Sequence, residues 1–544
     1  MSCPVSYEPY TAENFPVSLP CGHTVSQETA AAVLNQSLVF TDPGRLDLLG
    51  KRRFACPVCR AETIVASDHQ FPKNYTVLEL LESVSATPST PPAPPADSAA
   101  ADETQSSEPQ PEPCYHLSQY GRMISVKASS AGYATASRTP ELFLACDVSG
   151  SMDTVVDKNL GLTRLDLLKY NVEMLLRHLA NSDHEEPPKI TIVAFSSDAE
   201  IIARREPVTH DTLPALSNKV AALCPLYTTD IKLAMRTLLE TTVPGNHNLV
   251  ILLTDGQPTD QRGYITPDDP AEYLDILQEY QDRYSSFSTL GYGHRLSHRI
   301  MLETARLGGG VASFGSDESM ISNVFIRWVA WALTTLGKKP PQLTVRTPST
   351  TTTLQVSAMR WGTPYQYLLL PPEASITHKM DCDSTESNSG TPPSPATLRA
   401  QARLTFCETL ERCILRRDIT PLLQLHLDHL DPTLKNECLP NGQIGMAFQP
   451  RYFKTWGQAY LYATLRGHEI GHPWNFKDPS LQKFTSPAFE REVEQLDRIF
   501  QMMPSPTPSR EAHESIQSHG GMSQVFNNSS STCWLPDSPI TLAN

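Results

Sequence analysis

With 544 residues and a formal net charge of −15 at pH 7, the chain is too long for one hydrophobic core and too acidic for a typical nucleic-acid-binding protein. We therefore expect about three to four domains and no nucleic acid among the partners. The longest apolar stretch, 324–336, falls short of the roughly 20 residues that a membrane span needs, so we expect no span.

The first predicted element is a zinc site near the N-terminus. Cys21 and His23 are followed by Cys56 and Cys59, and three thiolates with one imidazole make the closed tetrahedral set of a structural zinc. The sequence therefore predicts one zinc. The other cysteines are scattered rather than arranged as a disulfide framework, which indicates a reducing compartment, cytoplasmic or nuclear.

The residues around these ligands resemble a RING finger, in which two interleaved quartets of ligands hold two zincs. At the positions of the other quartet stand Cys3, Ser6, Ser26 and Thr29, and neutral hydroxyls are poor zinc ligands beside thiolate. The resemblance therefore implies a degenerate RING domain over residues 1–84. It is closer to the SP-RING and U-box variants, in which hydrogen bonds between polar side chains replace one or both metals.

RING and U-box domains dock a ubiquitin-conjugating enzyme and orient its thioester-linked ubiquitin, which is catalysis by positioning. By this resemblance Val5 and Pro57 form the docking groove, and Arg60 contacts both ubiquitin and the conjugating enzyme. The resemblance thus implies a ubiquitin-protein ligase whose partner is a ubiquitin-conjugating enzyme. Two alternatives stay open: a non-catalytic adaptor, and a SUMO ligase, because SP-RING domains share the single zinc quartet.

Residues 85–113 have the composition of a linker. They are rich in proline, alanine, serine, threonine and acidic residues and have almost no apolar anchor, so burial cannot offset the entropy of ordering them. Similar composition predicts a second linker at 376–395 and a disordered tail at 504–544.

Residues 138–337 alternate strands with amphipathic helices, which is typical of a parallel sheet covered on both faces. The predicted strands are 141–146, 189–195, 248–253 and 287–293, and the clearest helix is 162–180. Ligands of such sheets collect at the carboxyl ends of the strands. Asp147, Ser149 and Ser151 follow the first predicted strand, and Asp255 follows the third.

Together with Thr229 in a later loop, this Asp-x-Ser-x-Ser pattern resembles the metal-ion-dependent adhesion site of von Willebrand factor A domains. The resemblance implies a doubly wound, Rossmann-like α/β domain whose ligands are Asp147, Ser149, Ser151, Thr229 and Asp255. Carboxylate and hydroxyl oxygens suit Mg²⁺ or another divalent cation. In the family the open position takes a carboxylate from a partner protein, so the domain would bind a substrate or partner. The alternative is a metal-free scaffold that retains the loop residues.

A His-Glu-x-x-His string near the C-terminus fits the zinc metallopeptidases, with Glu469 as general base between His468 and His472. That mechanism needs a continuous helix, whereas two glycines weaken helix here and Pro473 ends it. We therefore expect a helix end followed by a turn and no peptidase.

The C-terminal part resembles the module that follows A domains in intracellular proteins of the fungal Hint and von Willebrand A type, some of which carry a RING or U-box. The resemblance is carried by Trp456-Gly457, by residues 475–479 and by a helix at 488–502, and it implies a mainly helical module at 396–503. Strand patterns at 114–137 and 338–375 predict an accessory β-domain, a split sandwich packed on the A domain.

Overall fold

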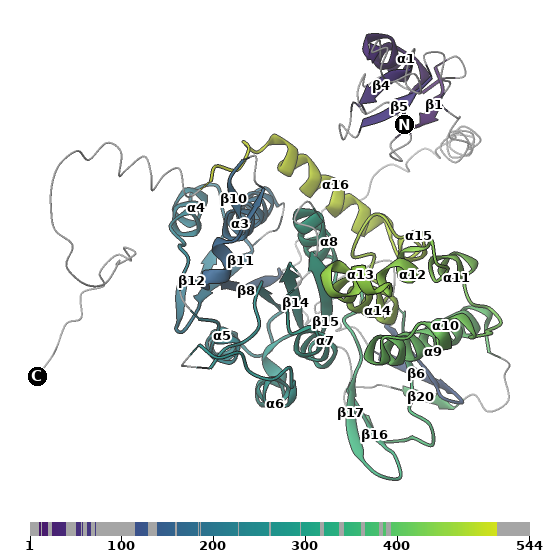
Figure 1. Cartoon of the computed structure of the whole chain (residues 1–544). Coiled ribbons are helices and arrows are strands. Elements are labelled where there is room, and N and C mark those ends of the chain that lie inside the picture. The colour runs from purple at the N-terminus through teal and green to yellow at the C-terminus, as the bar shows by residue number, and fades with distance from the viewer. Residues whose placement is uncertain are drawn as a thin grey trace, which may run out of the picture. The chain divides into compact units, whose positions relative to one another are not determined.

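The computed structural model describes residues 10–11, 14–19, 24–39, 51–55, 57, 62–66, 71, 115–128, 139–157, 160–182, 184, 186–226, 228–260, 263–293, 295–315, 320–336, 342–360, 365–379, 384–387 and 393–508. The chain divides into two compact units, Met1–Ser106 and Ser107–Asn544, which are described separately (Figure 1).

The first unit packs short strands against one helix. Its elements are β1 (Pro16–Ser18), β2 (Thr24–Ser26), α1 (Gln27–Gln36), β3 (Leu38–Val39), β4 (Arg52–Ala55) and β5 (Glu62–Val65). β1 and β2 form one antiparallel hairpin, and β3, β4 and β5 form a second antiparallel sheet. Val25, Leu34 and Phe54 are buried in the core between them. Helix α1 begins where the Ser26 side chain caps it.

The second unit is built on a sheet with strand order β12-β11-β8-β13-β14-β15. The bounds are β8 Glu141–Asp147, β11 Lys189–Phe195, β12 Ala199–Pro207, β13 Asn248–Thr254, β14 Ser286–Tyr292 and β15 Gly309–Gly315. The predicted all-parallel sheet is wrong at one edge, because β12 runs antiparallel to β11. Only 196–198 separate these two strands, and so short a connection allows a hairpin but not a parallel crossover.

Helices cover both faces of this mixed sheet (Figure 1). Along β8, Leu142, Leu144 and Cys146 enter one core, while Phe143 and Ala145 enter the other, because successive side chains of a strand point to opposite faces. The helices are α3 Arg164–Ala180, α4 Leu213–Ala221, α5 Ile231–Glu240, α6 Ala271–Glu279, α7 His298–Leu307 and α8 Ile321–Leu333. Burial on both faces explains why the strands read as continuous apolar runs.

The C-terminal region is helical, as the sequence predicts. Its elements are α9 Pro395–Arg416, α10 Thr420–Leu423, α11 Pro432–Glu437, α12 Gln443–Ala447, α13 Pro450–Tyr452, a π-helical turn Phe453–Gly457, α14 Gln458–Ile470, α15 Pro479–Gln482 and α16 Pro487–Met502. Helix α14 packs on β15, and α16 crosses α8 and α3, so the module shares its core with the sheet domain (Figure 1). Across the described ranges, no helix combines the length and apolarity needed to traverse a membrane.

Strands that precede the α/β domain in the sequence pair with strands that follow it. One sheet has the order β18-β7-β6-β20 and the other β17-β16-β19, and they share a core that includes Val126 and Val345. The bounds are β6 Tyr115–Tyr120, β7 Met123–Ala128, β16 Gln342–Arg346, β17 Thr351–Gln355, β18 Tyr365–Leu369, β19 Ser375–Lys379 and β20 Ser384–Ser387. β20 lies within 376–395, where the composition predicts a linker, and it pairs in parallel with β6.

Candidate functional site

The predicted adhesion residues lie at the carboxyl ends of two neighbouring parallel strands. Asp147 is the last residue of the fully buried β8, and Ser149 and Ser151 follow it at a 3₁₀ turn, Gly150–Asp153. Asp255 comes directly after β13. The register of β8 and β13 brings these ends together, with Leu253 opposite Cys146.

Hydrogen bonds join these side chains into one chain of contacts. Asp147 accepts the backbone N–H of Ser149 at 2.7 Å on Oδ1 and the Thr254 hydroxyl at 2.5 Å on Oδ2. The hydroxyl oxygens of Ser149 and Ser151 are 3.0 Å apart, and Ser151 donates to Asp255 Oδ1 at 2.7 Å. The two carboxylates are therefore linked through Ser149, which contacts Asp147 by its backbone N–H, and through the hydroxyl of Ser151.

Thr229 reaches the same place from a different loop. Its backbone N–H donates to the Thr259 hydroxyl at 2.9 Å, and its carbonyl accepts from Thr259 N at the same distance. A Cβ placed on Gly256 would lie 3.4 Å from Thr229 Oγ1 and 3.5 Å from Ser151 Oγ. Both hydroxyls thus border one point beside Gly256, and the structure brings all of the predicted ligands together.

The electrostatics of the site favour a bound cation. Burial raises the pKa of Asp147 to about 7, and the negative charge of Asp255 adds to this, against the lowering effect of hydrogen bonds from Thr254 and Ser149. Burial also raises the pKa of Asp255, although Ser151 and Arg164 partly offset it. Adjacent buried carboxylates with hydroxyl oxygens around them form a donor set that fits a hard divalent cation.

The comparisons with known proteins identify the domain that carries these residues. Residues 142–314 match the von Willebrand factor type A domain family. The chain contains a von Willebrand factor A domain. Residues 415–498 match a second family, described as VWA / Hh protein intein-like, so the helical region after the A domain is the module expected there. No curated protein sequence matches the chain.

The chain is also similar to several solved structures. One is a von Willebrand factor type A protein from Catenulispora acidiphila, at 14% identity and a TM-score of 0.40, covering 67% of this chain and 98% of that chain. Another is the ArnB paralog VWA2 from Sulfolobus acidocaldarius, at 16% identity and a TM-score of 0.36, covering 64% and 93%. A third is proximal thread matrix protein 1 from the mussel byssus with a zinc-occupied MIDAS motif, at 15% identity and a TM-score of 0.29, covering 36% and 48%.

The A-domain site holds one residue that the Asp-x-Ser-x-Ser pattern does not predict. Arg164, the first residue of α3, donates from Nη1 to Asp255 Oδ2 at 2.6 Å. A positive side chain at a helix N-terminus is opposed by the helix dipole. That unfavourable position is the one sequence signal that points to Arg164.

The predicted zinc ligands Cys21, His23, Cys56 and Cys59 lie outside the described residues, as do Val5 and Arg60. Pro57 is described, and it lies in the turn between β4 and β5. Their roles stay predictions. Elsewhere, in the parts of the chain that the structure does describe, no three His, Cys, Asp or Glu side chains are grouped to hold a metal.

The His-Glu-x-x-His string sits at a helix end, as expected. Helix α14 ends at Ile470, and Gly471 adopts a left-handed conformation with φ +67°, so His472 lies beyond the helix. The rings of His468 and His472 are both buried. This geometry does not provide the one-turn pair of helical histidines that a metallopeptidase needs.

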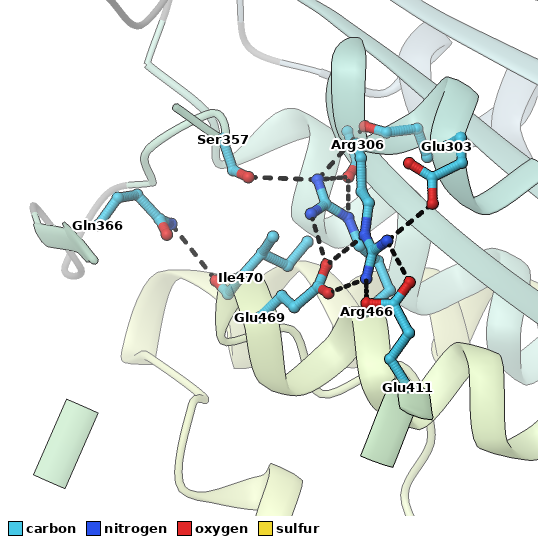
Figure 2. A network of polar contacts seen from close by, with 10 residues as sticks. Glu303, Arg306, Ser357, Gln366, Glu411, Arg466, Glu469 and Ile470 are labelled. Atoms are coloured by element: carbon cyan, nitrogen blue, oxygen red, sulfur yellow. Dashed lines mark hydrogen bonds and ion pairs between the residues drawn. The ribbon is translucent and has the colours of Figure 1, made fainter. Parts of the chain in front are cut away.

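Glu469 has a structural role instead (Figure 2). Its carboxylate accepts from Arg466 Nη1 at 3.0 Å and from both Nε and Nη2 of Arg306. Arg306 on α7 also pairs with Glu303 and Glu411, and Arg466 donates to the carbonyl of Gly310 at 2.7 Å. This network joins the A domain to α9 and α14 of the C-terminal module.

Proposed function

We propose that the A domain binds a protein partner through Mg²⁺ or another divalent cation held by Asp147, Ser149, Ser151, Thr229 and Asp255. The observation that carries this proposal is the chain of hydrogen bonds that links two buried carboxylates through Ser149 and Ser151. When bound, the cation supplies an open coordination position for a carboxylate of the partner. The protein's own contribution is to hold the oxygen donors at the ends of β8 and β13 and in the loop that carries Thr229.

Exposed apolar side chains beside the site indicate the chemistry of the partner. Residues 258–260 pair antiparallel with residues 263–266, with Thr259 bridged to Ile265, and Thr259 is bonded to Thr229. The second of these segments carries Tyr264 and Ile265, which are 71% and 63% exposed. Neighbouring exposed apolar side chains that are rimmed by polar groups mark contact surfaces. We therefore expect a partner segment with an acidic residue flanked by apolar ones.

A cation-binding experiment on the full chain tests this function. Titration calorimetry with Mg²⁺ or Mn²⁺ should show binding to the wild type and none to Asp147→Asn, which keeps the shape of the side chain but removes its charge. Thermal unfolding of the variant should stay close to that of the wild type. A wild type that binds neither cation would disprove the proposal.

The partner surface has its own test. Proteins recovered with the wild type, but lost with chelator and lost with Asp147→Asn, are candidate partners. Tyr264→Ser should weaken their binding while leaving cation affinity unchanged. Leu415→Ser is the matched control, because Leu415 is 65% exposed but lies on α9, in the C-terminal module. Equal effects of the two serine variants would refute the role of Tyr264.

For the N-terminal unit the second candidate function is ubiquitin transfer by a degenerate RING or U-box domain. One contact favours it: Ser26 and Thr29, which replace two zinc ligands of the RING pattern, are bonded to each other through their hydroxyls at 2.9 Å. Such a bond is the kind that stands in for a metal in U-box domains. Cys56 and Cys59 lie in sequence between β4 and β5, and Cys21 and His23 lie between β1 and β2.

A discharge assay separates the ligase from the adaptor. The wild type should accelerate ubiquitin discharge from at least one conjugating enzyme in a panel, and Val5→Ala and Arg60→Ala should each slow it while zinc content stays constant. Discharge of SUMO alone would indicate the SUMO ligase. If the zinc-containing protein accelerated the discharge of neither ubiquitin nor SUMO, the ligase would be rejected in favour of the non-catalytic adaptor.

A further inference from the structure

Arg164 is built into the adhesion site rather than placed on its surface. Its side chain is 11% exposed, and the Asp255 side chain that it contacts is 0% exposed. The backbone N–H of Arg164 donates to the carbonyl of Thr154 at 3.1 Å, which ties the start of α3 to the segment after the 3₁₀ turn. The helix dipole disfavours a positive charge at this position, so the ion pair with Asp255 has to offset that cost.

The space for the guanidinium depends on one glycine. Gly293 follows β14 with φ +86°, and a Cβ there would lie 2.8 Å from Arg164 Nη2. Any other residue would therefore suffer both backbone strain and a contact with the arginine. The chain thus keeps a slot open for Arg164 beside Asp255.

The two oxygens of Asp255 have different partners. Oδ1 accepts from Ser151, a member of the cation-binding set, whereas Oδ2 accepts from Arg164. Arg164 can therefore neutralise Asp255 without covering the oxygen that faces the other ligands. With Arg164 counted, the set formed by Asp147 and Asp255 has a net charge of about −1 instead of −2 when both carboxylates are ionised.

We propose that Arg164 is a positioning residue that sets how strongly the site holds its cation and how strongly the held cation attracts an acidic partner. This inference rests on the proposed function. A nearby positive charge weakens the binding of a second one, so the site binds its cation less tightly than its oxygen ligands alone would allow. The same charge leaves the loaded site more positive toward a partner carboxylate.

The sign of this effect distinguishes it from a merely structural role. Arg164→Gln should bind Mg²⁺ or Mn²⁺ about tenfold more tightly than the wild type, because a positive charge is removed near a divalent ion in a partly buried site. Loss of structure at the site would weaken binding instead. Arg164→Lys keeps the charge and should restore affinity to near the wild-type value.

The test is calorimetry of both cations with the full chain. Arg205→Gln is the matched control, because Arg205 pairs with Glu141 at the other end of β8, at 2.7 and 2.8 Å. It should leave cation affinity unchanged. Tighter binding by Arg164→Gln, with Arg164→Lys near the wild type, supports the inference. Equal or weaker binding by Arg164→Gln overturns it, and no binding by the wild type removes the proposed function as well.

Discussion

Replacing Glu469 with glutamine should destabilise the second unit by about 3 kcal/mol, because breaking a buried ion pair leaves the opposite charge uncompensated. Glu469 and Arg466 side chains are only 17% and 5% exposed, and the glutamate pairs with Arg306 as well. Losses at such sites run to about 3–5 kcal/mol. We expect the lower end because Arg306 keeps Glu303 and Glu411 as partners.

Urea denaturation followed by tryptophan fluorescence measures this change. Glu272→Gln is the control: it removes the exposed pair with Lys232, whose loss should cost no more than about 1 kcal/mol. A Glu469 variant as stable as the control would show that the network in Figure 2 does not hold the A domain and the module together. If that variant also lost a peptide-cleaving activity present in the wild type, the metallopeptidase hypothesis would return.

Three further outcomes are expected. Burial lowers the pKa of His468 to about 3 and that of His472 well below its usual value, so the unfolded chain binds protons that the folded chain does not. Between pH 6.5 and 4.5 each histidine should then reduce the free energy of unfolding by about 1.4 kcal/mol per pH unit of acidification, and a flat profile in urea titrations would contradict this. Gly293→Ala should displace Arg164 and tighten cation binding, as measured by calorimetry, and unchanged affinity would show that the slot is not needed. Elemental analysis of the full chain should find one zinc in the wild type and none in Cys56→Ala, whereas two zincs would mean that the ligands are misassigned.

Acidification should also weaken the network around Glu469. Burial raises the pKa of this carboxyl, but the charges and hydrogen bonds of Arg306 and Arg466 lower it by more than burial raises it. The pKa in the folded state therefore lies below the ordinary 4.5. A carboxyl with a depressed pKa stabilises the fold above its unfolded pKa and loses that contribution as pH falls through the folded value. Below pH 4.5, the free energy of unfolding of Glu469→Gln should therefore fall less with acidification than that of the wild type does.

Four of the five candidate ligands could be placed from sequence because they lie at strand ends, and a run such as 141–146 is recognisable by itself. Thr229 lies in a loop, and only the family resemblance indicated it. The contact of Arg164 with Asp255 could not be predicted, since it spans 91 positions and depends on the backbone of Gly293. The edge strand β12 was missed because its partly exposed residues lack a continuous apolar run. Sequence patterns report local burial, whereas these features depend on which distant segments meet.

The pairing of β7 with β18 has a consequence for synthesis of the chain. Met123 lies opposite Leu369, so about 240 residues must be made before the hairpin of β6 and β7 gains its third strand. At about 5–20 residues per second, that delay is about 12 to 50 seconds. During this time Ile124 and Val126, which end fully buried, have no cover from β18 or β16. The nascent hairpin is therefore exposed to mispairing on the ribosome until β18 has been made, and a chaperone that covers it during this time would protect it.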